Sequence, residues 1–278
     1  MILVTGATGN VGREVVRALA AAGAGVRAMV RDRAPADLPA DVQQVKADLN
    51  DPTTFGRAVD QAKGLFLLPG YDHTPELLAE AKAAGVEHVV LLSGSSAGLG
   101  DLTNAVTRYM SESEHLVRAC GLAWTILRPS AFMSNTLQWV PQLSSGDVVR
   151  APFAGVPVAN IDPADIGAVA AAAFLEDGHR ERLHRLTGPE PLLPADRLRI
   201  LAEALGRDLR FEAQPDDEAH TEMSASMPSE YVDAFFDFYV KGSLDESEVN
   251  TTVEDVTGRP ARTFTQWASA HTGAFGRL

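Results

Sequence analysis

Short apolar segments alternate with segments of helical periodicity through the first half of the chain. After the first apolar run, apolar residues recur three or four positions apart at Val11, Val15 and Leu19, as on the buried face of a helix. A similar pattern predicts a helix over 74–84. Apolar runs without this spacing predict six strands, at 2–5, 25–30, 42–47, 65–68, 88–92 and 122–127. Apolar strands separated by helices are typical of α/β proteins in which helices cover both faces of a parallel, doubly wound sheet.

The second half has a more mixed pattern. It predicts helices at 166–175, 197–205, 231–239 and 263–271, and strands at 184–186 and 209–213. We therefore expect a large first domain over residues 1–150, with residues 161–187 packing back on it. A smaller mixed domain is expected over residues 188–278.

Three glycines directly follow the first predicted strand and open the first predicted helix. Gly6 permits a tight turn, Gly9 lets the backbone approach a pyrophosphate, and Gly12 allows the helix to pack closely on the strand. The helix N-terminus adds unpaired N–H groups for the phosphates. This context predicts a Rossmann dinucleotide-binding domain, with the smaller domain on the substrate side. The predicted cofactor contacts here are Gly6, Thr8, Gly9, Asn10, Val11 and Gly12.

The end of the second strand bears on which dinucleotide binds. Arg31 and Arg33 are suited to a ribose 2′-phosphate, whereas Asp32 between them is suited to a free 2′-hydroxyl. Because two arginines flank one aspartate, we predict NADP(H), with NAD(H) as the alternative.

Composition and net charge limit the classes of molecule that the protein is expected to bind. The chain has 278 residues, a formal net charge of −13 and one cysteine, Cys120. A strongly acidic protein repels phosphate backbones, so no nucleic-acid partner is expected. A lone cysteine suits a reducing compartment, and the longest uncharged apolar run, 166–175, is too short to cross a bilayer. We expect a cytoplasmic protein without a signal peptide or membrane partner. The seven scattered histidines predict no metal site.

Several segments resemble the NmrA-like atypical short-chain dehydrogenase/reductases. The opening segment Thr5-Gly6-Ala7-Thr8-Gly9-Asn10-Val11-Gly12 is similar to the start of that family. Later similarities lie at 30–32, 47–49, 122–129, 161–166, 186–190 and 254–260. The family includes NADPH-dependent quinone reductases, triphenylmethane-dye reductases and non-catalytic NAD(P)-binding regulators.

The resemblance implies further cofactor contacts at the carboxyl ends of strands, where open α/β sheets bind ligands. These are Asp48 and Leu49 near the adenine, Leu67, Leu68 and Pro69 near the adenosine, Ser93 near the nicotinamide ribose, and Pro129, Ala131 and Phe132 near the nicotinamide. For Leu67 and Phe132, a place in the core is an equally good interpretation.

The catalytic pattern of ordinary short-chain dehydrogenases is incomplete. They use Tyr-x-x-x-Lys on one helix, where the lysine lowers the tyrosine pKa and the tyrosine donates a proton. Here Tyr109 is followed four residues later by Ser113 instead. Tyr109 is the one catalytic candidate. Without the lysine, we expect acceptors whose hydride adduct is already stabilised, such as quinones and other electron-poor conjugated compounds.

The substrate side is predicted from aromatic and apolar residues after the sixth strand. Phe132, Met133 and Trp139 are the candidates to line a site for a small aromatic or conjugated substrate. Tyr231, Phe235 and Phe238 also suit such a wall, although aromatic residues at helical spacing are more often core.

Three other interpretations were weighed against the reductase. A non-catalytic NADP(H) sensor that binds a protein partner fits the missing lysine equally well. A hydrolase would use Ser96 of Gly94-Ser95-Ser96-Ala97-Gly98, but would leave the N-terminal glycines without a role. A sugar-nucleotide epimerase needs the same tyrosine and lysine pair.

Overall fold

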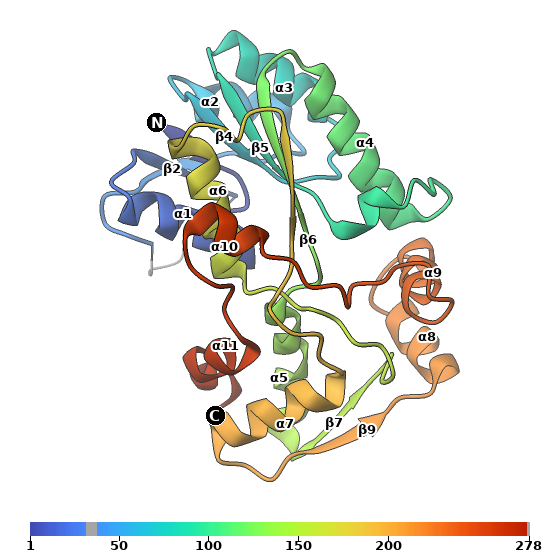
Figure 1. Ribbon diagram of the computed structural model, residues 1–278. Coiled ribbons are helices and arrows are strands. Elements are labelled where there is room, and N and C mark those ends of the chain that lie inside the picture. Colours follow the sequence, from blue (N-terminus) through green and yellow to red (C-terminus); the bar gives the residue numbers. More distant parts are fainter. Residues whose placement is uncertain (32–37, 277–278) are drawn as a thin grey trace.

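A seven-stranded parallel sheet forms the larger part of the molecule in the computed structural model, which describes residues 1–31 and 38–276. Its order is β3-β2-β1-β4-β5-β6-β8 (Figure 1). The strands are β1 (Ile2–Val4), β2 (Val26–Val30), β3 (Gln43–Lys46), β4 (Gly64–Leu67), β5 (His88–Leu92), β6 (Ala123–Pro129) and β8 (Arg182–Leu186). The predicted doubly wound Rossmann sheet is thus confirmed.

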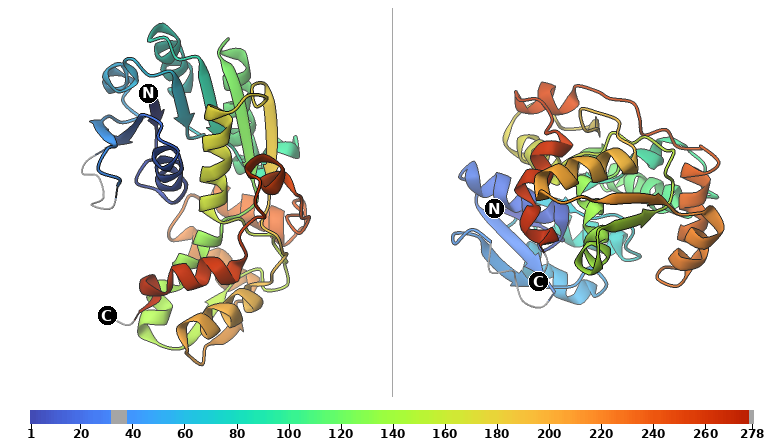
Figure 2. Two further views of the ribbon diagram at one scale, coloured as in Figure 1. Left: turned by 60° about the vertical axis from the view of Figure 1, so that its left-hand side comes forward. Right: turned by 90° about the horizontal axis from the view of Figure 1, so that it is seen from below.

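Helices cover both faces of the sheet. One layer holds α1 (Asn10–Ala21), α6 (Pro163–Leu175) and α10 (Thr252–Thr257), which share one apolar cluster with the sheet (Figures 1 and 2). The other holds α2 (Phe55–Val59), α3 (Thr74–Ala83) and α4 (Ala105–Ala119). Because helices cover both faces, every position of an inner strand can be buried, as in β5.

Strand register places the ends of neighbouring strands at one edge. Leu3 of β1 pairs with Arg27 of β2 on one side and with Leu65 of β4 on the other. The strand order therefore reverses between β1 and β4. Open α/β sheets bind ligands at the carboxyl ends of the strands beside such a reversal.

A smaller group of elements, which we call the cap, lies beyond the carboxyl end of β6 (Figure 1). It comprises the 3₁₀ helix η3 (Met133–Trp139), α5 (Val140–Ser145), β7 (Val148–Ala151), α7 (Pro194–Leu205), β9 (Arg210–Ala213), α11 (Phe264–Ala270) and the 3₁₀ helix η4 (Thr272–Phe275). Strands β7 and β9 form a separate parallel pair. A core of its own includes the fully buried Trp139, Phe264 and Trp267.

Two helices connect the cap to the outer helix of the sheet. α8 (Asp216–Ser224) leads into α9 (Ser229–Tyr239), and α9 packs on α4 through Phe238, Ala234 and Val106. The predicted division into residues 1–150 and 188–278 stays a prediction, and the β7–β9 pair takes one strand from each side of it.

The elements absent from the prediction are short. The sequence analysis placed no strand at β7 and no helix at α5, α8 or α10. α8 is mostly polar, with Asp216, Asp217 and Glu218 in its first turn and only Ala219 buried, so apolar periodicity gives no signal there. β7 has four residues and pairs only with a strand sixty residues later, a contact that local sequence does not encode.

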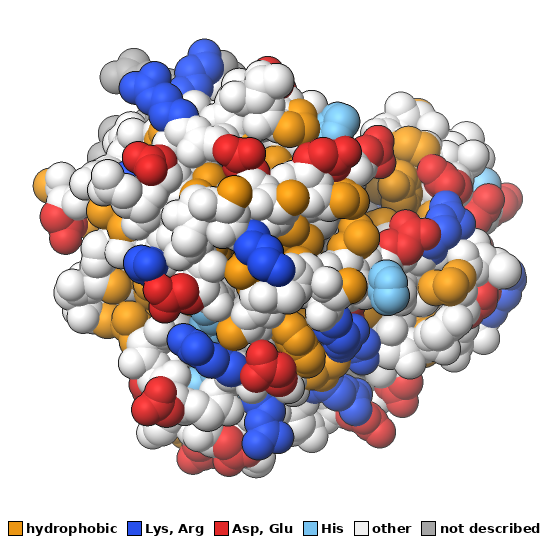
Figure 3. Space-filling model, turned by 90° about the horizontal axis from the view of Figure 1, so that it is seen from above, with side chains coloured by type: hydrophobic (Ala, Val, Ile, Leu, Met, Phe, Trp, Pro, Cys, Tyr) orange, Lys and Arg blue, Asp and Glu red, His pale blue; other side chains and the backbone are white. Residues whose placement is uncertain are grey.

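The surface mixes charge and apolar side chains. On the end of the molecule opposite the cap, basic and acidic side chains alternate with small apolar groups (Figure 3). Of the helices in the described residues, none is long and apolar enough to cross a bilayer.

Candidate functional site

The predicted glycine loop connects β1 to α1 in a conformation that needs glycine at two positions. Gly6 has φ +60°, and a Cβ added there would lie 2.6 Å from the Leu68 side chain. A Cβ on Gly12 would lie 2.2 Å from the Gly6 carbonyl oxygen, well inside contact distance. The start of α1 is therefore pressed against the loop, as the spacing of the glycines predicts.

The N-terminus of α1 is open to a ligand. Gly9 is the N-cap, no side chain caps the helix, and no acidic residue lies in its first turn. Thr8, Gly9 and Asn10 are exposed. The first backbone N–H groups of a helix have no partner within it, and together with the helix dipole they favour phosphate. This cradle fits the pyrophosphate of a dinucleotide.

Next to the glycine loop, the ends of β1 and β4 are joined by a buried threonine. The Thr5 hydroxyl donates to the Phe66 carbonyl at 2.9 Å and accepts from the Leu68 N–H at 3.2 Å. Leu68 and Pro69 are half-buried at this edge. Leu67 is fully buried in the core beneath α2 and α3, so its side chain does not face the edge.

The adenosine end holds the remaining predicted contacts. Asp48 is half-buried, and its carboxylate accepts from the Asn50 backbone N–H at 3.0 Å, while Leu49 is buried. Arg31 is exposed directly after β2. Asp32 and Arg33, on which the choice between NAD(H) and NADP(H) also depends, lie outside the described residues.

Beneath the predicted nicotinamide end lies a buried ion pair that the sequence did not indicate. Ser93, predicted to face the nicotinamide ribose, is buried and donates to Glu114 at 2.6 Å. Both Glu114 carboxylate oxygens also accept from the Arg128 guanidinium at 2.7 Å. Burial opposes ionisation, but hydrogen bonds from Arg128 and Ser93 and the charges of Arg128 and Arg118 together lower the pKa of Glu114. The network joins α4 to the ends of β5 and β6.

The segment after β6 approaches the same edge. Pro129 is buried, Ala131 and Phe132 are half-buried, and Phe132 packs against the core between the sheet and α1. Met133 is buried in the core of the cap. The structure thus brings this segment and the glycine loop to one side of the sheet, and gives Met133 a core environment.

One cavity joins the glycine loop to the cap. Its volume is about 670 Å³, and its walls include Asn10 on the glycine loop and Ala131 after β6. The opposite wall carries four aromatic side chains from three segments of the chain: Trp139 of η3, Phe153, and Phe235 and Tyr239 of α9. Of the predicted substrate residues, Trp139 lines the cavity, whereas Phe132 and Met133 are absent from its described lining.

The predicted catalytic tyrosine lies on α4, outside the described lining of this cavity. The Tyr109 ring packs edge-on against Tyr231, with centroids 6.1 Å apart, and faces Gly70. Burial, reinforced by Tyr231, raises the pKa of Tyr109 to about 12. Ser113, which replaces the lysine, donates to the Tyr109 carbonyl at 2.8 Å and accepts from the Gly70 N–H at 3.0 Å. The catalytic role of Tyr109 stays a prediction.

Glu246 organises the boundary between the sheet and the cavity, and the sequence analysis did not single it out. This buried carboxylate accepts from the Ser95 hydroxyl, from the Tyr239 hydroxyl at 2.8 Å and from the Ala131 N–H at 3.1 Å. Burial raises the pKa of both Glu246 and Tyr239. Its segment has no helical or strand pattern, so no local signal identifies it.

Arg197 is the second missed residue in this region. It lines the cavity from the first turn of α7 and is only 9% exposed. Three and four residues later, Ile200 and Leu201 are also buried. A charged residue on the apolar face of the predicted helix over 197–205 is the signal that could have drawn attention to it.

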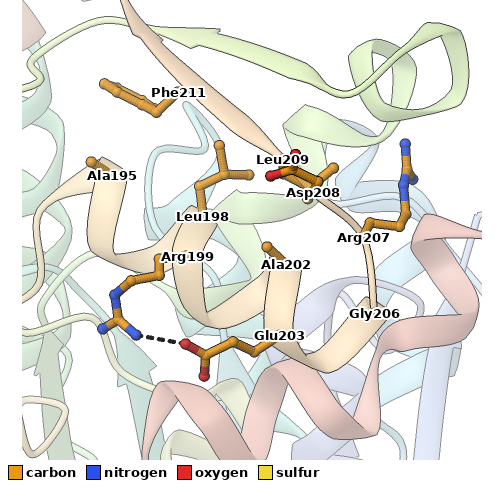
Figure 4. A pocket seen from close by; sticks show the side chains of 10 residues that line it. All are labelled: Ala195, Leu198, Arg199, Ala202, Glu203, Gly206, Arg207, Asp208, Leu209 and Phe211. Carbon is orange, nitrogen blue, oxygen red and sulfur yellow. Dashed lines mark hydrogen bonds and ion pairs between the residues drawn. The ribbon is translucent and has the colours of Figure 1, made fainter.

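A second pocket lies on the outer side of α7 (Figure 4). It has a volume of about 410 Å³ and is lined by α7, the turn after it and β9, with Arg199 and Glu203 forming an ion pair at 2.9 Å. None of the predicted cofactor or substrate residues lines it. We therefore place the candidate site in the cavity beside the glycine loop.

The motif considered for a hydrolase has a different geometry from a nucleophile elbow. Ser96 is buried in the 3₁₀ helix η2 (Ser95–Gly98), and residues 99–104 separate it from α4. The strand-to-helix turn that exposes a hydrolase serine is not formed there.

Comparisons with known proteins agree with this geometry. The sequence model of an NAD(P)H-binding family matches residues 6–177. The chain is 40% identical over 282 residues to (4-alkanoyl-5-oxo-2,5-dihydrofuran-3-yl)methyl phosphate reductase of Streptomyces griseus, with 99% of each chain covered. It is 36% identical to NAD(P)H azoreductase of Xenophilus azovorans, again with 99% of each covered. The fold matches an Escherichia coli NADPH-dependent quinone oxidoreductase in complex with NADPH, with TM-score 0.77, 22% identity, and 97% and 99% of the two chains covered.

Proposed function

From the premise that this chain belongs to the NAD(P)H-binding family and is an NAD(P)H-dependent oxidoreductase, we propose that it reduces a small, electron-poor conjugated acceptor. Quinones and unsaturated lactones are the compounds in view. NADPH is the proposed preferred reductant, on the strength of Arg31 after β2.

The cavity beside the glycine loop carries this proposal. It extends from Asn10 and Ala131, next to the expected cofactor, to Trp139 and Tyr239 in and beside the cap. Aromatic walls provide flat, apolar surfaces suited to planar conjugated molecules. Its volume of about 670 Å³ lies in the usual range for small-molecule sites.

The state of Tyr109 and the positions of the lysines favour an acceptor whose reduction needs no strong proton donor from the protein. The four lysines are Lys46, Lys63, Lys82 and Lys241. Within the described part of the chain, none of them forms a hydrogen bond with Tyr109, whose pKa is raised to about 12. A tyrosine with a raised pKa is a poor proton donor compared with one activated by lysine.

Conjugated acceptors avoid this requirement. Bound NADPH would supply a hydride. An unsaturated carbonyl compound would take it at the β-carbon, the C=C electron pair would shift to the bond between the α-carbon and the carbonyl carbon, and the carbonyl π pair would move onto the oxygen. The resulting enolate is stabilised by delocalisation and takes its proton from water. The chain then needs only to hold the acceptor beside the nicotinamide and to exclude competing reactions.

The alternative of a non-catalytic sensor is not favoured. The two relatives that match nearly the whole chain at 40% and 36% identity are both named as reductases. The aromatic-walled cavity also supports a small-molecule acceptor more than a protein partner.

The test is NADPH oxidation at 340 nm with a panel of quinones, azo dyes, and a furanone methyl phosphate with its dephosphorylated alcohol, with NADH in parallel. We expect turnover of at least one conjugated acceptor and a preference for NADPH. A simple aliphatic ketone is the negative control. Tight NADPH binding without turnover of any conjugated compound would overturn the proposal and favour the non-catalytic sensor instead.

A further inference from the structure

The cavity contains a buried cation without a counter-ion. Arg197 is 9% exposed, and among the described residues no carboxylate lies within ion-pair distance of its guanidinium. Its contacts are a hydrogen bond from Nη1 to the Thr136 hydroxyl at 3.3 Å and a cation–π contact with the Trp139 ring, 5.2 Å from the centroid. The buried Nε atom has no hydrogen-bond partner. Such a group is costly to bury unless something compensates its charge.

The other charged side chains of the cavity wall have polar partners and are exposed. Arg150 pairs with Glu218 at 2.6 Å, and Glu222 accepts from the Gln214 amide at 2.7 Å. The exposed ends of these side chains are in contact with solvent as well. Arg197 therefore differs from them in both burial and pairing.

Other buried polar atoms around the cavity also lack partners. Besides Arg197, the lining residues Ser134, Trp139 and Asn160 each have a buried side-chain nitrogen or oxygen without a hydrogen bond among the described residues. Three of the four groups, those of Arg197, Ser134 and Trp139, are donors or can donate. Unpaired donors that line the same cavity as a buried cation favour a ligand rich in acceptors and negative charge.

Arg197 does not avoid the cost of burial by losing its charge. Burial lowers its pKa to about 10, so the guanidinium is still charged at neutral pH. The nearby Tyr239 hydroxyl already donates to Glu246, so it offers Arg197 at most a lone pair.

We propose that Arg197 is the anion-binding residue of the acceptor site, and that the natural acceptor is a conjugated compound bearing a phosphate monoester. The guanidinium presents paired N–H donors that match phosphate oxygens, and the low dielectric around it strengthens the attraction. The Trp139 ring beneath the guanidinium holds it in place. The aromatic wall takes the conjugated part of the acceptor. This inference rests on the proposed reductase function and specifies its substrate class.

The experiment compares one acceptor in three forms: the furanone methyl phosphate, a carboxymethyl ether of the same furanone, and the free alcohol. At saturating NADPH, we expect kcat/KM for the phosphate ester to exceed that for the alcohol at least about 100-fold, with the carboxylate between them. Arg197→Met should reduce the ester-to-alcohol ratio at least about 30-fold, and Arg197→Lys should reduce it less, because lysine keeps the charge but loses the paired donors.

The same helix offers a matched control. Arg199 is two residues away on α7, but it is exposed, lines the outer pocket and pairs with Glu203 (Figure 4). Arg199→Met should leave the ester-to-alcohol ratio as it is in the wild type. Inorganic phosphate at saturating NADPH should inhibit the wild type competitively against the ester, and this inhibition should be lost in Arg197→Met.

Four outcomes separate the possible failures. Equal kcat/KM for the three acceptor forms in the wild type would overturn the anion site while leaving the reductase standing. A fall in all rates by the same factor in Arg197→Met would show a structural role only. A fall in NADPH affinity in that variant would place Arg197 at a cofactor phosphate instead, and no turnover of any form would overturn the proposed function itself.

Discussion

The two sides of the cavity present polar groups in opposite ways. On the glycine-loop side, the groups offered to a ligand are backbone N–H groups at the start of α1, and no side chain caps them. On the cap side, they are buried side chains such as Arg197 and Ser134, carried by separate segments. The first arrangement suits a phosphate that every dinucleotide shares. We propose that the second recognises groups that differ from one acceptor to another, and we expect changes of substrate to arise there.

The largest expected effect comes from breaking the backbone arrangement. In Gly12→Val, the new Cβ would lie 2.2 Å from the Gly6 carbonyl, so the loop and the start of α1 must move apart. We expect NADPH affinity, measured by fluorescence titration, to fall about 1,000-fold, or about 4 kcal/mol. Gly273→Val is the control, because a Cβ at that exposed glycine meets nothing within 4 Å. Unaltered NADPH binding in Gly12→Val would contradict the placement of the pyrophosphate.

A pH titration separates the stability of the sheet from the chemistry of the cavity. His88 is buried at the start of β5, and its ring shares a hydrogen bond with the Thr125 hydroxyl at 2.9 Å. Burial, with smaller contributions from Arg180 and His179, lowers the pKa of His88 from 6.5 to about 4. Between these values the unfolded chain binds a proton that the native one does not. Stability should therefore fall by up to about 3 kcal/mol as the pH drops from about 6.5 to about 4.

Chemical denaturation at several pH values measures this effect. The slope of unfolding free energy against pH in that window should be smaller in His88→Phe, which cannot be protonated. The ester-to-alcohol ratio should be the same in His88→Phe and wild type at neutral pH, because His88 is far along β5 from the carboxyl edge. An unchanged slope in the variant would show that another group titrates.

A smaller effect is expected where a charged side chain supplements the backbone side. Arg31 is exposed, so a contact with a 2′-phosphate there is screened by solvent. We expect Arg31→Ala to raise KM for NADPH about tenfold and to leave KM for NADH within about twofold. Steady-state kinetics with both cofactors measures the change. A parallel rise for both would mean that Arg31 does not read the 2′-phosphate.

The smallest expected effects come from removing either of two buried hydroxyls, those of Ser134 and Ser130, which lie four residues apart. The Ser134 hydroxyl lines the cavity and has no hydrogen-bond partner among the residues that the structure describes, whereas the Ser130 hydroxyl donates to the Ala159 carbonyl at 2.5 Å. Ser134→Ala should raise KM for the phosphate ester about threefold without loss of thermal stability, because no internal hydrogen bond is broken. Ser130→Ala should lower the unfolding free energy by about 1 kcal/mol. A destabilised Ser134→Ala would mean that its hydroxyl serves the fold.

The sequence predicted the two sides of the cavity with unequal success, for a physical reason. The glycine loop lies within seven consecutive residues, so its spacing alone indicates both its conformation and its ligand. Apolar runs likewise predicted the inner strands β1, β4 and β5, because strands buried on both faces carry a strong local signal.

Contacts between distant segments explain what the sequence did not predict. Glu246 meets Ala131 across 115 positions, and Arg197 meets Thr136 across 61. Nothing near Glu246 in sequence distinguishes it from the other acidic residues of its segment. Phe132, Met133 and Trp139 were predicted together as substrate residues, but Phe132 packs against the core of the sheet, whereas Met133 and Trp139 pack in the core of the cap, where Trp139 also lines the cavity.

The path of the chain has a consequence for how this protein can be altered. From β6 it enters the cap, returns for α6 and β8, enters the cap again with α7, returns for α10 on the face of α6, and ends in the cap with α11. A graft of another enzyme's cap would need several simultaneous crossovers, each joining two cores correctly. New acceptor specificity is therefore easier to reach, in the laboratory or by descent, through point substitutions on the cavity wall than through exchange of whole segments.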